Sequence, residues 1–286
     1  MKHAYLILAH GDFIALDHLV RALDDIKNDV FIHIDKRVKS IPSFKMTKGG
    51  LFLLEKRIKT YWGDYSLLEA EFLLMHAAYK KGVYSYYHII SGAHFPLKKQ
   101  DYVHSFYESY YPNSLLLTMK TTKDEIIFKT GRYHFFVKYL APKGTIVSET
   151  ANFFWRLLLF LQKPFPHRNI EGIDDKASQW CSLTDEAVGY IISQSILLKK
   201  RFRKTFCCDE FFIPMILKKG SLSYESVPNL LYVKFRRYSP KVLQMEDYDS
   251  LMSSGCLFAR KFGDNSEELI EEIKKSYDEK NTHIRN

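Results

Sequence analysis

Two adjacent carboxylates, Asp209 and Glu210, stand inside the aromatic and aliphatic stretch FCCDEFFIPMIL. The pattern predicts that they begin a helix, where acids suit the positive end of the backbone dipole and can serve as caps. Neighbouring helical residues point about 100° apart, so that when one acid caps or faces solvent the other can face the interior. An acid surrounded by Phe206, Phe211 and Phe212 would be partly desolvated. Desolvation raises the pKa of a carboxylic acid and suits it to general acid or base catalysis. The local sequence leaves capping and catalysis both open.

Basic side chains gather in two segments farther along the chain. Arg260 and Lys261 follow a short apolar run in SGCLFARKF and are flanked by Phe258 and Phe262, which indicates an anchored backbone with outward-reaching cations. Such cations can neutralise a diphosphate leaving group, as a divalent ion does in other enzymes. Solvated surface charge is the alternative. The upstream segment YVKFRRYSPK supplies Lys234, Arg236, Arg237 and Lys241.

The spacing of acids, histidines and cysteines gives poor support for a catalytic metal. Transferases that bind sugar nucleotides through a metal usually need two acids one residue apart at a strand end, whereas HIDKR offers Asp35 alone. Asp247 and Asp249 have this spacing, but in a predicted helix. The 11 histidines form no H-E-x-x-H motif, and the 4 cysteines form no short-spaced pair that resembles a zinc knuckle or a secreted disulfide framework. We expect reduced thiols and no catalytic metal; a metal-dependent transferase using Asp35 or Asp249 is the alternative.

The elements that position these side chains begin with a strand-helix-strand unit. Residues 4–9 form a short apolar run typical of a buried parallel strand, and HGD breaks it. Apolar residues then recur at helical spacing from Phe13 to Ile26, and a second strand, 30–35, follows. The loops of such a unit emerge at the carboxyl edge of the sheet, where open α/β sheets bind ligands.

The alternation of strands and helices continues to about residue 120. Strands are predicted at 51–54 and 84–92, and helices at 64–81 and 98–109. We therefore expect a Rossmann-like sheet with helices on both faces. The segment lacks both the G-x-G-x-x-G fingerprint and the P-loop motif, so a bound nucleotide must be held in another way.

A mostly apolar segment, NFFWRLLLFLQK, lies in the middle of the chain and is ended by Pro164. It predicts an amphipathic or apolar helix of about three turns with basic residues at its rim. Two interpretations remain open for this helix. It can be a core helix, or a surface element that touches lipid or a lipid-linked acceptor.

The rest of the chain shows no interdomain linker and no internal repeat. We predict a single α/β domain over residues 1–286, with a nucleotide-binding half at 1–120 and an acceptor-binding and catalytic half at 121–286. Thr184 is a plausible N-cap of a helix. The elements expected in the second half are a strand at 179–184 and helices at 185–200, 209–219, 245–254 and 266–280.

The composition, 46% hydrophobic and 26% charged, is that of an ordinary globular protein. A formal net charge of +9 implies anionic partners such as a nucleotide, a membrane surface or a nucleic acid. No charge-free apolar run approaches ~20 residues and no signal peptide is apparent, so we expect a cytoplasmic protein. A non-enzymatic protein that binds polyanions or anionic lipid is an alternative from another functional class.

Several segments, taken in order, resemble the family of core-2/I-branching β-1,6-N-acetylglucosaminyltransferases and peptide O-xylosyltransferases. The motifs are AYLILAH with FIHID, then YYHIISGAHFPLK, SQWCSLTDEAVGYI, CCDEFF and LFARKF, which together span roughly Ala4 to Phe262. The ordered set is more specific than any single motif. The resemblance implies a GT-A-like fold with a mixed sheet flanked by helices, an inverting mechanism and a UDP-sugar donor. It also implies that no metal is needed, because basic side chains stabilise the diphosphate.

The resemblance assigns roles to the acid pair and to the basic residues. The second acid of the family's D-E motif, its catalytic base, falls on Glu210, which leaves Asp209 to cap or orient the turn. The lysine of the family's F-A-x-K-F motif falls on Lys261, beside Arg260. A second cation for the diphosphate is expected in the upstream basic segment, with Lys241 and Arg237 as the candidates.

The remaining predicted site residues surround the nucleotide and the sugars. His94 stands where family members have an acid, which puts the role of this position in doubt. The predicted nucleotide contacts are Ala9, His10, Asp35 and Arg57. The residues predicted around the donor and acceptor sugars are Ser91, Gly92, Ser178, Gln179, Trp180, Glu125 and Arg132.

The activity that the resemblance implies is transfer of a sugar, with N-acetylglucosamine favoured, from a UDP-sugar to a hydroxyl of an acceptor glycan. The chain shows neither the membrane anchor nor the long stem of the animal enzymes, and it resembles a bacterial relative working in the cytoplasm on surface polysaccharide intermediates. Its positive charge and the apolar helix suit peripheral attachment at the inner face of the membrane, near lipid-linked acceptors. We expect no nucleic-acid partner.

Overall fold

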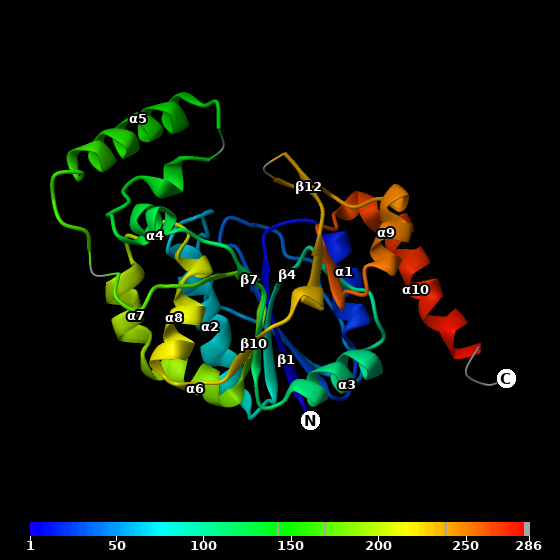
Figure 1. The fold of residues 1–286 in the computed structure, drawn as a ribbon. Helices are drawn as coiled ribbons and strands as arrows, with labels where there is room; N and C mark the ends of the chain where they lie inside the picture. Colours follow the sequence, from blue (N-terminus) through cyan, green and yellow to red (C-terminus); the bar gives the residue numbers. More distant parts are fainter. Residues whose placement is uncertain (142, 169, 238, 283–286) are drawn as a thin grey trace.

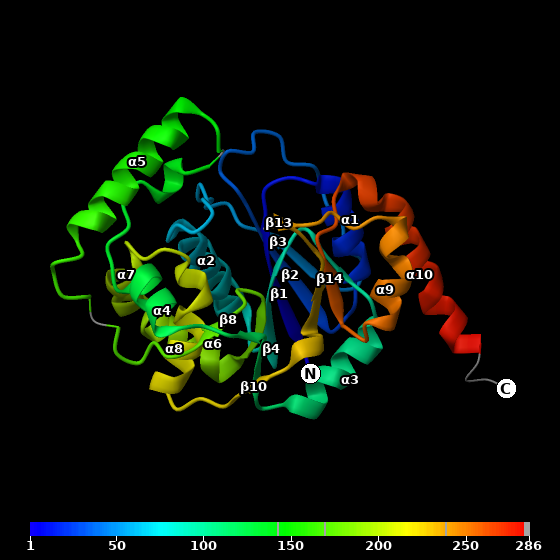
Figure 2. The ribbon, with the colours of Figure 1, turned by 45° about the horizontal axis from the view of Figure 1, so that its top comes forward.

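The computed structural model describes residues 1–141, 143–168, 170–237 and 239–282. Its centre is a mixed sheet with helices on both faces (Figures 1 and 2), which confirms the predicted fold class. The strand order is β10 (Tyr224–Ser226), β6 (Ser114–Leu116), β9 (Cys181–Thr184), β4 (Tyr86–Ser91), β1 (His3–Ala9), β2 (Asn28–Ile34) and β3 (Gly50–Leu53).

Both halves of the chain contribute to this one sheet. Strand β9 pairs antiparallel with β4 and β6, whereas the other neighbouring strands pair in parallel. The Rossmann-like part therefore does not stop near residue 120, because β9 and β10 complete the sheet from the second half. Three smaller sheets accompany it. The first consists of β11 (Leu231–Val233), β14 (Phe258–Arg260) and β5 (His94–Pro96). The second pairs β12 (Phe235–Arg236) with β13 (Ser239–Pro240), and the third pairs β7 (Thr118–Met119) with β8 (Lys176–Ala177).

Helices pack on both faces because the central strands are apolar on both sides. In β1, Leu6 and Leu8 face one core and Tyr5 and Ile7 the other, as the two-residue period of a strand requires. The helices are α1 (Phe13–Ala22), α2 (Ser66–Lys81), α3 (Gln100–Tyr110), α4 (Lys123–Thr130), α5 (Ile146–Leu161), α6 (Asp185–Ser193), α7 (Ser195–Phe202), α8 (Phe212–Lys219), α9 (Tyr248–Ser253) and α10 (Glu267–Thr282).

Three helices differ from the sequence prediction. Helix α1 ends at Ala22, before the predicted Ile26, which is 75% exposed in the turn that leads into β2. The helix predicted at 185–200 is interrupted at Gln194 and forms α6 and α7, although its N-cap is as predicted, since the Thr184 hydroxyl accepts from the Ala187 amide. The acid pair lies in a 3₁₀ turn, Cys208–Glu210, that precedes α8 rather than in its first turn. All four cysteines are free and buried, as expected.

Helix α5 lies on the surface, so the core-helix interpretation is wrong. A reciprocal capping box between Thr145 and Ser148 starts it six residues earlier than predicted. Only Ser148 and Ala151 of the helix are buried, whereas Phe153 and Phe160 are each 63% exposed. Figure 1 shows α5 beyond α4, away from the sheet. Within the described residues, no helix is both long and apolar enough to cross a membrane.

The imidazole of His134 fastens α5 to the body of the protein. Its Nε2 donates to the carbonyl of Phe128, 2.7 Å away, and its Nδ1 accepts from the indole of Trp155 on α5 at 3.1 Å. The neutral ring, with its hydrogen on Nε2, therefore makes both hydrogen bonds. Burial lowers the pKa of His134 to about 4, and the charge of Arg168 also lowers it. The docked arrangement therefore depends on an uncharged ring.

We expect His134 to make stability fall on acidification. The unfolded chain takes up this proton near pH 6.5 and the folded chain only near pH 4, so stability is lost progressively as the pH falls through that window. Between pH 7 and 5 the loss due to this residue is about 2 kcal/mol. Denaturant unfolding of His134→Asn at both pH values should show a correspondingly smaller drop than the unmodified protein. His167→Asn, at an exposed histidine, is the control, and equal drops in all three proteins would contradict the assignment.

Candidate active site

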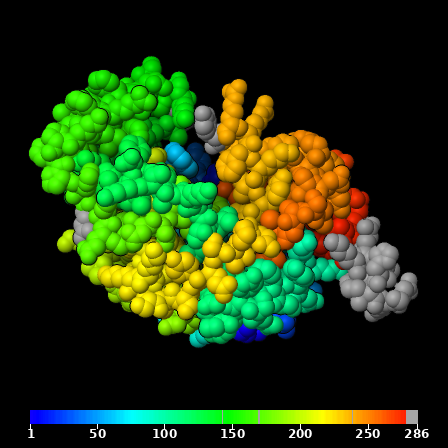
Figure 3. Space-filling model, in the orientation of Figure 1, coloured from blue at the N-terminus to red at the C-terminus, as the bar shows by residue number. Residues whose placement is uncertain are grey.

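The predicted nucleotide residues meet at the carboxyl edge of the parallel strands. The Asp35 amide, just after β2, donates to the Ala9 carbonyl at the end of β1. The Gly92 amide, just after β4, donates to the carbonyl of Leu8. Ligands of open α/β sheets bind at this edge. Figure 3 shows the surface hollowed here, between the green mass of α4 and α5 and the orange hairpin of β12 and β13.

The carboxylate of Asp35 is occupied by two residues that the sequence reasoning missed. Arg37 donates to it from Nε and Nη2 at 2.9 and 2.8 Å, and Thr60 donates from its amide and hydroxyl at 2.8 and 2.7 Å. Although burial opposes ionisation, these hydrogen bonds hold the pKa of Asp35 below its usual range. The positive group beside Asp35 is therefore the guanidinium of Arg37. The metal-dependent alternative would place a metal ion at this position.

Two further residues predicted to contact the nucleotide are His10 and Arg57. His10 is exposed, and partial burial of its ring and the charge of Lys261 lower its pKa. The guanidinium of Arg57 donates to the Val38 carbonyl. Their contacts with a nucleotide stay predictions.

Glu210 belongs to a cluster of two carboxylates and two lysines. The ammonium of Lys129 lies 2.6 Å from Glu210 and 2.9 Å from Glu125, and that of Lys176 lies 2.7 Å from Glu125 and 3.4 Å from Glu210. All four side chains are between 13% and 27% exposed. Despite burial, the two lysines lower the pKa of Glu125 to about 2. The cluster fixes the position of the Glu210 carboxylate while one side stays open to solvent.

The sequence analysis predicted Glu125 beside the acceptor. In the structure, Glu125 and Glu210 share the same two lysines. The two lysines were missed, although Glu125 and Lys129 have the i, i+4 spacing of a helical ion pair. Arg132, also predicted here, is placed differently. Its guanidinium donates to the carbonyls of Gln162 and Phe165, at 2.7 and 2.9 Å, and so binds the C-terminal end of α5, where carbonyls lack helical partners.

Asp209 points into the protein and caps nothing, so its predicted capping role is wrong. Neither the 3₁₀ turn nor α8 has a side-chain cap, and Oδ1 of Asp209 is buried without a hydrogen-bond partner among the described residues. Burial, and then the charge of Glu210, raises the pKa of Asp209 to about 7. Its charge also acts on buried Glu71 of α2, whose pKa burial raises strongly. The two acids do have separate environments, as the sequence suggested.

Arg260, on β14, lies against the ring of Trp180. It pairs in register with His94 across β14 and β5, and its guanidinium lies 4.9 Å from the ring centre of Trp180. Burial lowers the pKa of Arg260 to about 10. The Nδ1 atom of His94 accepts from the amide and hydroxyl of Ser91, and burial and Arg260 keep the His94 pKa far below its usual value. A neutral ring thus faces the arginine.

Lys261 and Lys241 come from adjacent chain segments. The Lys261 amide donates to the carbonyl of Lys241 at 3.4 Å, and the Leu243 amide donates to the carbonyl of Lys261 at 2.8 Å. The ammonium of Lys261 lies 3.8 Å from the Asp12 carboxylate. The structure thus supports the predicted proximity of Lys261 to the upstream basic segment.

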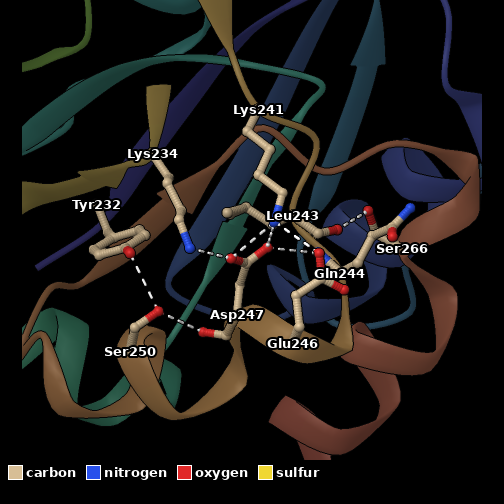
Figure 4. A network of polar contacts seen from close by, with 9 residues as sticks. All are labelled: Tyr232, Lys234, Lys241, Leu243, Gln244, Glu246, Asp247, Ser250 and Ser266. Carbon is tan, nitrogen blue, oxygen red and sulfur yellow. Dashed lines mark hydrogen bonds and ion pairs between the residues drawn. The ribbon is translucent and has the colours of Figure 1, made fainter. Parts of the chain in front are cut away.

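Lys241 is held by acids of its own (Figure 4). Its ammonium lies 2.8 Å from both Asp247 and Glu246, and Lys234 binds the same buried Asp247 at 2.7 Å. Asp247 is therefore paired with two lysines. Arg237 is exposed in the β12–β13 hairpin with a φ of 57°.

One short segment, Lys176–Trp180, connects the acid pair to the basic side. Lys176 contacts Glu210 at its start, and Trp180 stacks against Arg260 at its end. Gln179 donates to Glu71 and so faces the interior, and Ser178 accepts from the Trp180 amide. Four residue steps span at most about 14 Å between the Cα atoms of Lys176 and Trp180, so Glu210 and Arg260 contact opposite ends of the same short segment.

Close packing accounts for the lack of a side chain at Gly92. A Cβ atom there lies 3.1 Å from Cβ of Ala9 and 3.3 Å from a methyl group of Leu16, closer than ordinary contact. The absence of a side chain allows β4 to continue against the end of β1. As sugar contacts, Gly92, Ser91 and Ser178 stay predictions.

Comparison with known families identifies the class and the family. The mixed α/β sheet, with acids and cations at its carboxyl edge, is an arrangement suited to transfer from an anionic donor. Residues 3–251 match the sequence model of the core-2/I-branching enzymes, and the chain therefore belongs to this family of glycosyltransferases. Membership in an enzyme family leaves the non-enzymatic polyanion-binding alternative without support. A search of curated protein sequences finds no match.

Solved structures give weaker similarities. Mouse xyloside xylosyltransferase 1 in its apo form has a TM-score of 0.38 and 10% identity, and the match covers 90% of this chain and 97% of that one. S. aureus TarS has a TM-score of 0.29 and 12% identity over 43% of this chain and 22% of that chain. TM-scores this low carry no argument about the site.

Proposed function

We propose that the chain is an inverting, metal-independent glycosyltransferase that moves N-acetylglucosamine from a UDP-sugar to a hydroxyl of an acceptor glycan. The observation that carries this proposal is the segment Lys176–Trp180, which contacts Glu210 at one end and Arg260 at the other. A general base and a phosphate-binding cation then stand on two sides of one site. The setting we infer is the synthesis of bacterial surface polysaccharide.

The proposed reaction is a single displacement. Glu210 takes the proton from the acceptor hydroxyl while that oxygen forms its bond to C1 of the donor sugar. The bond from C1 to the diphosphate oxygen breaks, and its electron pair leaves with UDP. Attack opposite the leaving group inverts the configuration at C1. One carboxylate is enough, because the diphosphate leaves readily once its charge is neutralised.

Lys261 and Arg260 are proposed to neutralise the leaving diphosphate. The ammonium of Lys261 has Asp12 at 3.8 Å, a loose contact that an incoming phosphate can replace. Lys241 has three short contacts to Asp247 and Glu246, so we assign it to shaping the segment. Asp35 is paired with Arg37 and Asp247 with two lysines, which supports the metal-independent form of the proposal over the metal-dependent alternative.

Replacement of the base should separate catalysis from binding. Glu210→Gln keeps the size of the side chain but cannot accept the proton, so kcat should fall by two to four orders of magnitude with UDP affinity largely unchanged. Transfer to a glycan acceptor and UDP binding by calorimetry measure the two effects. Glu186→Gln, an exposed acid on α6, serves as the control.

Asp209→Asn tests the other acid of the pair. Its pKa of about 7 also suits a base, so the comparison decides between two candidates. A larger loss of kcat in Asp209→Asn than in Glu210→Gln would transfer the assignment to Asp209. Normal turnover in Glu210→Gln would remove Glu210 from the mechanism.

Loss of the phosphate-binding cation should weaken both nucleotide binding and chemistry. We expect Lys261→Ala to raise the Kd for UDP about tenfold or more, which corresponds to at least 1.4 kcal/mol, and to lower kcat as well. Lys275→Ala on α10 is the matched surface control. UDP should raise the melting temperature more than ADP does. EDTA should leave transfer intact, and a loss restored by Mn²⁺ would favour the metal-dependent alternative.

We also propose that α5 attaches the enzyme to an anionic membrane, where lipid-linked acceptors are available. Its exposed apolar residues form a continuous outer face: Ile146, Val147, Phe153, Phe154, Leu157, Phe160 and Leu161. Exposed cations lie on α5 and in the segments that flank it, at Lys138, Lys143, Arg156 and Lys163, and outnumber the one exposed acid of the helix, Glu149. An apolar face with a basic rim suits an interface of anionic lipid better than an apolar protein surface.

Vesicle sedimentation tests the attachment. The protein should bind vesicles that contain anionic lipid more strongly than neutral ones, and salt should weaken this binding. Phe153→Ser combined with Phe160→Ser should reduce bound protein about tenfold or more, because two aromatic side chains no longer enter the lipid. Val83→Ser, at another exposed apolar residue, is the control. Equal binding by all three proteins, or a dimer lost only in the double variant, would contradict membrane attachment.

A further inference from the structure

A second group of polar side chains lies at the other end of the sheet. Asp25 belongs to the turn before β2, and Asp101 and His104 lie one helical turn apart on α3. One ligand atom from each of the three residues lies within 4.8 Å of the others. None of the three takes part in the proposed transfer reaction.

One ring nitrogen of His104 is free to act as a ligand. The amide nitrogen of Asn28 donates to the carbonyl of Leu23 and to Gln100, so the oxygen of Asn28 must be the atom that faces Nε2 of His104, 2.8 Å away. An amide oxygen only accepts, and Nε2 therefore carries the hydrogen. Nδ1 is left as an acceptor, and it is buried without a partner among the described residues, in a side chain only 2% exposed.

We propose that Asp25, Asp101 and His104 form a binding site for a divalent transition-metal ion such as Zn²⁺. A histidine whose second ring nitrogen donates to an oxygen is the usual form of a metal-bound imidazole. Around a tetrahedral zinc ion, ligand atoms lie ~3.3 Å apart. Side-chain movements of about 1 Å would bring the three ligand atoms to this spacing. Two carboxylates and one imidazole leave a fourth position for water.

The identity of the ion follows from the donors. Two carboxylates neutralise a divalent charge, and the imidazole favours zinc or another late first-row ion over Mg²⁺ and Ca²⁺. The ion can enter through the adjoining surface cavity, which Asp25 and Asp101 line together with Lys98 and Lys99. These nearby cations oppose the metal, so we expect micromolar rather than nanomolar affinity.

The proposed ion acts on the structure and not on the transfer chemistry. Asp25 precedes the first residue of β2, whereas Asp35 follows its last residue at the catalytic edge. Six residue steps of a strand separate the two edges by about 20 Å. Figure 1 shows α3 beside the N-terminus, at the opposite end of the sheet from the β12 hairpin. The ion would join α3 to the turn between α1 and β2.

Thermal unfolding of the full chain, stripped with EDTA and titrated with ZnCl₂, tests the proposal. At about 100 times Kd, Zn²⁺ should raise the melting temperature by about 4 °C, and equilibrium dialysis should show one tightly bound ion. Asp101→Asn alters an exposed side chain that the fold does not need, and it should abolish the shift and weaken binding at least tenfold.

Glu186→Gln is the control, because it removes one negative charge from an exposed position on α6. It should keep the full shift. Zinc stabilisation that is absent, or equal in Asp101→Asn and the unmodified protein, would overturn the site. Neither outcome depends on transfer activity, so the proposed function can stand or fail separately.

Discussion

The direction of strand β9 is the constraint on which the site depends. The parallel strands β1, β2 and β4 all end at one edge of the sheet, and β9 runs against β4, so β9 begins at that same edge. The residues just before it, Lys176–Trp180, therefore arrive where the loops after the parallel strands also lie. A parallel strand in this place would carry them to the other end of the sheet. The reversal lets one segment contact both Glu210 and Arg260.

The charges at this edge differ in how firmly they are held. Lys129 and Lys176 are shared between two glutamates. In the turn that begins α9, Lys241 contacts Glu246 and Asp247, and Lys234 contacts Asp247. Lys261 has one contact at 3.8 Å. A cation with short contacts to several acids gives up favourable interactions to bind a ligand, whereas a loosely paired one gives up little. Of these five lysines, Lys261 is the most loosely paired, which supports its proposed role at the diphosphate.

The sequence predicted the fold better than the contacts of individual side chains. Apolar runs and helical spacing located β1, β2, α2 and the N-cap Thr184, because each depends on local pattern and burial. The exposure of α5 could not be read from its residues, since an apolar helix suits a core as well as a surface. Family motifs placed Glu210 and Lys261. The partners of Glu210 were missed because Lys176 lies more than thirty residues from it in the chain and reaches it through β8.

Arg260 shows why an anion belongs in this site. Its guanidinium is largely withdrawn from water, and its Nε atom is buried without a hydrogen-bond partner among the described residues. The ring of Trp180 lies against the guanidinium and in turn contacts the ring of His94, but neither ring supplies a negative charge. His94 stands where the family motif has an acid. A buried cation without a carboxylate partner is costly by several kcal/mol unless a ligand compensates it. Under the proposed function, a diphosphate bound beside Trp180 would recover that free energy, and donor affinity would then be linked to the folding of the β14 and β5 pair.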